Sequence, residues 1–251
     1  MNRPQGNMEW KVTEHMRRPY YFMAESIFRK ALIEQLGPVI AGVRSGMDYN
    51  DVIDMIQGEK VQEAFRYVYG DVGTAFAKGT FAQFAAQQAE GMENVFRQFM
   101  NDFVDQNTAA RVTTITNTSK ETARGIIKKV VAENMNEGAD KLGMAIEKAL
   151  KKEGARISGW RSRVIARTEV ATASNYGKQL GAETVGQPML KRWLSTMDNR
   201  TRDIHFSMNG ETVPMDGYFN VGGDLMRMPG DMNASPANVI NCRCTTTYEV
   251  I

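Results

Sequence analysis

The chain has 251 residues, of which 42% are hydrophobic and 24% are charged, and its formal net charge is +2. These are the proportions of an ordinary globular protein, so the composition excludes a wholly disordered chain. No run of 18 uncharged apolar residues occurs, which excludes a membrane-spanning helix. Residues 1–6 lack the apolar run of a secretory signal, and two cysteines are too few for a disulfide framework. We therefore expect a reducing compartment.

The first 106 residues are predicted to be helical. Apolar side chains recur at helical spacing over residues 24–32, 61–76 and 81–99. Gly37 and Pro38 are expected to end the first of these helices. No proline occurs from residue 39 to residue 187, which permits long helices because proline breaks helix interiors.

The middle of the chain, residues 107–157, is predicted to be a helical connector. Residues 107–118 are rich in Thr and Asn without a helical apolar period, so they indicate a loop. A capping box from Thr118 to Glu121 then predicts a helix start, and a short following helix is expected to end at Gly154. A third helix over residues 158–180 is predicted to end at Gly181, with Trp160 on its apolar face.

After Pro188 the pattern changes, and residues 158–251 are predicted to form a small mixed domain with short strands. Residues 189–195 alternate as a strand does, with Trp193 pointing inward. A short helix capped by Asp198 or Thr201 should follow. Further strand fragments are expected at 211–213, 225–228 and 242–250, and a helical turn at Ser235 and Pro236. The predicted fold class is α+β, a largely helical N-terminal part followed by this mixed C-terminal domain.

Positive charge is concentrated in residues 111–167, which carry thirteen basic and six acidic residues, a local net charge of +7. Within this region residues 148–163 form a basic stripe, with six basic residues and one acid, Glu153. Such a stripe can contact the phosphates of nucleic acid or an acidic protein surface. On charge alone, a solvated helix face is the more frequent explanation of such a stripe. The candidate contact residues are Lys148, Lys151, Lys152, Arg156 and Arg161.

Polar residues in the last third of the chain form three sequence clusters. We interpret them as a buried network whose members hydrogen-bond to one another and so specify the fold. The candidate network residues are Arg163, Arg167, Thr168, Glu169, Asp198, Arg200, Thr201, Arg202, His205, Asp231, Asn241, Cys242, Arg243 and Cys244.

Two alternatives use some of the same side chains. An enzyme acting on nucleic acid or a nucleotide would take Glu169 or Asp198 as general base and His205 as acid. A zinc-stabilised module would use His205, Cys242 and Cys244, although a structural zinc site normally has four ligands. We expect no catalytic residues, no cofactor and no metal.

The order and spacing of five motifs resemble those of the Mu F-like phage head morphogenesis proteins. The resemblance covers about residues 111–250, and Met232 stands where the family commonly has proline. The motifs are IARTE at 165–169, KRW at 191–193, DNRTRDIH at 198–205, PGD at 229–231 and NCRC at 241–244.

The resemblance implies a minor capsid protein of a tailed phage, made in the host cytoplasm and placed in the virion at the portal and the head interior. Its implied partners are the portal protein, other head proteins and packaged double-stranded DNA, with an influence on packaging or ejection. No membrane and no small-molecule substrate are expected. The helical region 1–106 is expected to dock against a partner, as helices with adaptable apolar faces do.

Overall fold

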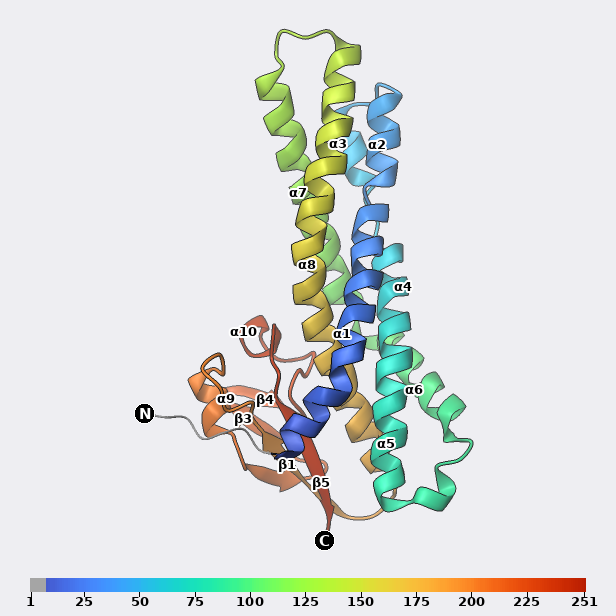
Figure 1. Ribbon diagram of the computed structural model, residues 1–251, viewed down its shortest axis with the longest axis vertical. Helices are drawn as coiled ribbons and strands as arrows, with labels where there is room; N and C mark the ends of the chain where they lie inside the picture. The colour runs from blue at the N-terminus through green and yellow to red at the C-terminus, as the bar shows by residue number, and fades with distance from the viewer. Residues whose placement is uncertain (1–7) are drawn as a thin grey trace. The chain divides into compact units, whose positions relative to one another are not determined.

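A computed structural model describes residues 8–251 (Figure 1), so the first seven residues of the predicted helical region lie outside it. The described chain forms two compact units, and each combines segments that are distant in the sequence. Unit 1 consists of residues 8–24, 66–107 and 164–251, and unit 2 of residues 25–65 and 108–163. Across residues 8–251, every helix is too short or too polar to cross a membrane. The domain boundaries predicted from the sequence, which give domains 1–106, 107–157 and 158–251, remain predictions.

Unit 2 is helical around an apolar core. It contains α2 (Gly37–Arg44), α3 (Tyr49–Asp54) and α7 (Ala109–Glu133), with parts of α1 (Met8–Glu34), α4 (Glu59–Val68) and α8 (Ala139–Thr184). Asp48 caps α3 by accepting the backbone N–H of Asn50 at 2.8 Å. The buried core residues are Leu36, Val39, Val43, Val52, Ile53, Ile56, Ala123, Ile127, Val130, Ile146 and Leu150.

The predicted loop at 107–118 and the predicted capping box are wrong, because α7 is continuous from Ala109. Thr114 and Thr118 donate their hydroxyls to the carbonyl four residues earlier, so these side chains find their hydrogen-bond partners within the helix. The predicted ends at Gly154 and Gly181 are also wrong, since both lie inside the 46-residue α8. A Cβ at position 154 would collide with Leu36, so Gly154 permits close packing instead of ending the helix.

The helical part of unit 1 contains a short π-helix, η1 (Tyr69–Gly73), then α5 (Thr74–Phe84), a 3-10 turn, η2 (Ala86–Gln88), and α6 (Met92–Asn107). The predicted single helix at 81–99 is therefore wrong, and it is broken between α5 and α6. Helix α8 packs very closely against η1 and α5. A Cβ at Gly177 would overlap the carbonyl oxygen of Gly73, and a Cβ at Gly181 would overlap that of Ala77.

The remainder of unit 1 confirms the α+β fold class. Strand β1 (Met189–Leu194) is the centre of an antiparallel sheet, between β2 (Thr212–Pro214) and β5 (Thr245–Val250). Strands β3 (Phe219–Val221) and β4 (Asp224–Met226) form a separate hairpin. Gly222 and Gly223, both at positive φ, make the two-residue turn of that hairpin, as a right-twisted hairpin requires. Trp193 is fully buried, as predicted. Two short helices, α9 (Asp203–Ser207) and α10 (Pro236–Val239), lie in the connections between the strands.

The predicted helical turn begins at Pro236 with Ser235 in the cap position, as expected. The predicted cap of the preceding helix is wrong, because α9 begins at Asp203 and Arg202 occupies its cap position. Asp198 and Thr201 lie in the loop between β1 and α9, where the carboxylate of Asp198 has other partners.

Candidate functional site

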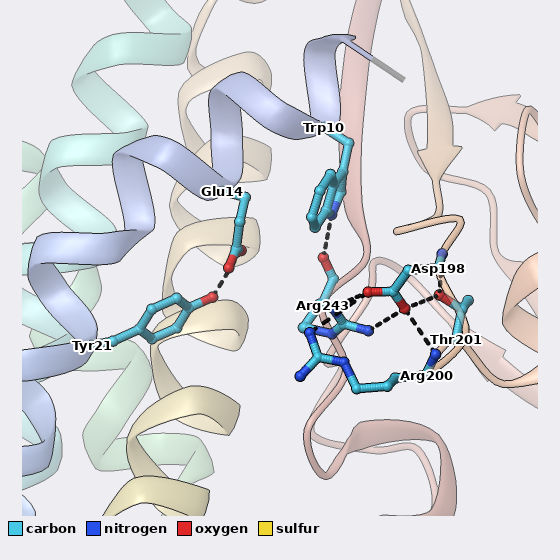
Figure 2. Close-up of polar contacts among 7 residues, drawn as sticks. All are labelled: Trp10, Glu14, Tyr21, Asp198, Arg200, Thr201 and Arg243. Carbon is cyan, nitrogen blue, oxygen red and sulfur yellow. Dashed lines mark hydrogen bonds and ion pairs between the residues drawn. The ribbon is translucent and has the colours of Figure 1, made fainter. Parts of the chain in front are cut away.

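An ion pair between Asp198 and Arg243 joins the loop after β1 to the turn before β5 (Figure 2). Both guanidinium nitrogens of Arg243 donate to the two carboxylate oxygens at 2.7 Å, a bidentate geometry that is stronger than a single bond. The backbone N–H of Arg200 and the hydroxyl of Thr201 donate to the same carboxylate at 2.9 and 3.2 Å. The Arg243 guanidinium is the main reason that the pKa of Asp198 lies well below its usual range.

Helix α1 contacts the same turn through two side chains that the sequence analysis did not single out. Trp10 donates its indole N–H to the carbonyl of Arg243 at 2.8 Å (Figure 2). Arg17 is fully buried and donates to Ser174 at 2.7 Å and Asn175 at 2.8 Å, and also to the carbonyls of Arg243 and Cys244. Its position gave a weak signal in the sequence, because Arg17 lies at helical spacing from Thr13 and Ala24 and therefore on the same face of the helix. The structure shows that Thr13 and Ala24 are buried.

Asn175 of α8 is the hub of this network. Its amide nitrogen donates to the carbonyls of Pro229 and Cys244 at 2.8 and 3.0 Å. Its oxygen accepts from Arg17 and from the hydroxyl of Thr245, both at 2.8 Å. Its hydrogen-bonding capacity is thus filled by groups from α1, the 229–230 loop and β5. These bonds fix the loop and the strand against α8.

A second cluster contains His205, Cys242 and Cys244, all buried. The Nδ1 atom of His205 lies 3.6 Å from the Sγ atom of each cysteine, and both cysteines are free thiols. Its Nε2 atom lies 3.2 Å from the side-chain oxygen of Asn238, another residue that the sequence analysis did not single out. The neighbouring Cys244 sulfur and burial raise the pKa of the Cys242 thiol, whereas the neighbouring Cys242 and His205 lower the pKa of Cys244.

The other predicted network residues lie in smaller groups. Thr168 accepts the N–H of Asn241 at 3.0 Å, and Arg202 donates to the carbonyl of Ile240 at 2.6 Å. Asp231 accepts two backbone N–H groups of its own loop, from residues 227 and 233.

Three further candidates are separate from both clusters. The buried carboxylate of Glu169 accepts from the hydroxyl of Tyr69 at 2.7 Å. Arg163 belongs to unit 2, where it is exposed and forms an ion pair with Glu25 at 3.4 Å. Arg167 is exposed on α8.

The basic stripe lies on the unit 2 part of α8. Lys148 and Lys152 are exposed and one helical turn apart. Lys151 and Arg156 are also exposed, and they pair with Glu147 and Glu153 at 2.6 and 2.8 Å.

One predicted contact residue, Arg161, and the nearby Trp160 differ from expectation. Arg161 is half-buried and donates to the Ser119 hydroxyl and the Ile115 carbonyl, and burial lowers its pKa. Trp160 is 66% exposed, so the predicted apolar position is wrong and an aromatic side chain lies beside the stripe.

Comparisons with known proteins found one matching family and two similar proteins. Residues 125–247 match the family described as phage Mu protein F like protein. The minor head protein GP7 of Bacillus phage SPP1 is 27% identical over 143 residues, which are 56% of this chain and 42% of that protein. The NAD(+)–arginine ADP-ribosyltransferase EFV of Enterococcus faecalis (strain ATCC 700802 / V583) is 35% identical over 85 residues, 33% of this chain and 17% of that protein.

The chain therefore spans less than half the length of either relative. No solved structure matches it with comparable significance. The matched segment contains all five motifs of the resemblance described above. Residues 125–247 are thus similar to the phage Mu protein F like family, and the resemblance to phage head morphogenesis proteins seen in the motifs is confirmed over this segment.

Proposed function

We propose that the protein is a minor head protein of a tailed phage, a structural component of the virion that binds the portal protein and other head proteins. The family match and the similarity to the SPP1 minor head protein support the head role. The relative that is named as an ADP-ribosyltransferase matches over only 17% of its length, which gives little support to a transferase role.

One structural observation favours a structural role over catalysis. The groups that an enzyme would use as acid and base are engaged by other side chains. Glu169 is 4% exposed and bonded to Tyr69, and His205 is 1% exposed and beside Asn238. The alternative base, Asp198, is half-buried and held in the bidentate ion pair with Arg243. A general acid or base must reach a substrate proton within hydrogen-bond distance. Buried partners within the fold instead give these groups the role of fixing its loops.

The head role is tested on purified particles of the phage that encodes the chain. Quantitative mass spectrometry should detect the chain in particles that have been separated from free protein. Chemical cross-linking of intact particles should then join it to the portal protein. Absence from particles would contradict the head role. Presence without any portal cross-link, while cross-links to other head proteins form, would contradict the portal assignment alone.

The exposed lysines of α8 support a second part of the proposal, non-specific binding to packaged DNA. Lys148 and Lys152 present two positive charges to solvent one helical turn apart, near exposed Trp160. Lysines that neutralise phosphates release counterions, so binding should weaken steeply as salt rises.

DNA binding is tested by fluorescence anisotropy with duplexes of unrelated sequence at several salt concentrations. Lys148→Glu/Lys152→Glu should weaken binding and reduce the slope of log affinity against log salt by about 2, since each phosphate contact contributes about 0.9. Lys30→Glu/Lys60→Glu is the matched control, because it makes the same charge change at exposed lysines of unit 2 outside the stripe. Equal losses in both variants would show that only net charge matters and would remove the stripe from the proposal.

A further inference from the structure

The three donor atoms of His205, Cys242 and Cys244 are arranged as metal ligands are. All three lie within 4.8 Å of one another, and the Nδ1 atom is equally far, 3.6 Å, from both sulfurs. A tetrahedral zinc ion with Zn–N near 2.0–2.1 Å and Zn–S near 2.3 Å places its nitrogen and sulfur ligands about 3.6 Å apart. The two nitrogen–sulfur distances therefore fit a common zinc ion.

Neighbouring hydrogen bonds fix the imidazole in the state that binds metal. The amide nitrogen of Asn238 donates to the carbonyl of Val221 at 3.0 Å and to the carboxylate of Asp224 at 2.7 Å. The amide oxygen of Asn238 is thereby left to accept from Nε2 of His205, so the ring proton lies on Nε2. The Nδ1 lone pair then faces both sulfurs. Zinc-binding histidines use the same arrangement, with the second nitrogen held by an outer hydrogen bond.

Thiol hydrogen bonds alone satisfy this arrangement poorly. A single lone pair on Nδ1 can accept one S–H, yet two sulfurs lie at the same distance from it. One cation at the centre would engage all three donors at once, and each ligating thiol would release its proton to solvent. The donors are 1%, 3% and 2% exposed, and the ring of Trp193 packs edge-on against His205 at 5.8 Å.

We propose that His205, Cys242 and Cys244 supply three of the ligands of one bound zinc ion. It would tie α9 to the turn before β5, two segments about 40 residues apart that share the small core around Trp193. Thiolate and imidazole are the ligands that zinc favours. This site is separate from the head-protein role, which could hold or fail without it.

The test uses the full chain, expressed without a histidine tag and purified without added metal. Elemental analysis should find about one zinc per chain, because buried thiolate sites retain zinc through purification. His205→Asn and Cys244→Ser should each reduce the ratio at least tenfold. His15→Asn is the matched control, since His15 is the other histidine of the chain and is exposed on α1, and it should keep the zinc.

The wild-type chain decides the question even if the ligand variants do not fold. Removing metal with a strong chelator should lower the melting temperature and increase the reactivity of both thiols toward a disulfide reagent on the order of tenfold, because thiolates in a metal site are protected. Replacement with Co²⁺ should produce the thiolate-to-cobalt charge-transfer band. A zinc ratio near zero with unchanged thiol reactivity after chelation would overturn the proposal. A stoichiometric ion other than zinc would overturn the identity of the metal.

Discussion

The interior of unit 2 is apolar, whereas that of unit 1 contains many polar and charged side chains. Among the described residues of unit 2, the buried polar groups are neutral, such as Gln35 and Ser119, which bond to each other at 2.9 Å. Unit 1 buries Arg17, Lys178 and Glu169. Apolar packing depends mainly on volume and tolerates related residues. Directed bonds to buried charges depend on geometry, so unit 1 should be the less tolerant of conservative changes.

The largest effect is expected at Arg17. Arg17→Ala should destabilise the protein by about 3–5 kcal/mol, because it removes a fully buried side chain together with its hydrogen bonds to Ser174, Asn175 and two backbone carbonyls. Arg17→Lys should lose much of the same stability, since an ammonium cannot reproduce the planar fork of donors. The measurement is the free energy of unfolding from denaturant titration. Arg18→Ala, at the neighbouring exposed position of α1, should stay within about 0.5 kcal/mol of wild type. Similar losses of unfolding free energy at Arg17 and Arg18 would show that the buried network of unit 1 is no more sensitive than an exposed position.

A smaller effect is expected in the core of unit 2. Leu150→Ala should destabilise by about 2–5 kcal/mol because it leaves a cavity, while Leu150→Met, which keeps the volume, should cost less than about 1.5 kcal/mol. The same denaturant titration checks this. Met144→Ala is the surface control, because Met144 is 71% exposed on the same helix. If Leu150→Met were as damaging as Arg17→Lys, the two interiors would not differ in tolerance.

The smallest effect is a pH dependence due to Lys178. This lysine is buried and donates to the hydroxyls of Thr13 and Thr245, and burial lowers its pKa from 10.5 to about 7. Above pH 7 the folded chain loses this proton while the unfolded chain keeps it up to about pH 10.5. The unfolded state then binds more protons, so the contribution of Lys178 to stability rises with pH.

Comparison with Lys178→Met isolates this contribution, because other titrating groups cancel in the difference. The free energy of unfolding of wild type, relative to the variant, should rise by about 1 kcal/mol between pH 6 and pH 8. A difference that does not change with pH would show that Lys178 keeps its ordinary pKa in the folded chain.

Much of the C-terminal fold could be predicted from the sequence because its signals are local. Alternation identified the strand containing Trp193, and the Ser-Pro pair identified the turn at 235–236. The long helices were harder to predict, because glycine and threonine have low helix propensity by themselves. In α7 and α8 local bonds and tertiary contacts override that propensity: Thr118 bonds within its own helix, and Gly154 packs against Leu36.

The site was predictable in its residue types but not in its grouping. The motifs contained Asp198, Arg243 and the two cysteines, yet their spacing does not say that Arg243 pairs with Asp198 while its neighbours face His205. Arg17 and Asn175 were missed because their partners lie between 54 and 227 residues away along the chain, and several of those partners are backbone carbonyls that no side-chain pattern reveals. Which distant groups meet is decided by tertiary packing.

The contact of Gly177 and Gly181 with the carbonyls of Gly73 and Ala77 also limits which codons the gene can carry there. Every missense change at a glycine codon adds at least a β-carbon, and at these two positions that carbon would meet rigid backbone. At Gly79 and Gly125 the same added atom would enter open space. The four helical glycines therefore differ in mutational freedom, and the pair on α8 should remain glycine as the gene diverges.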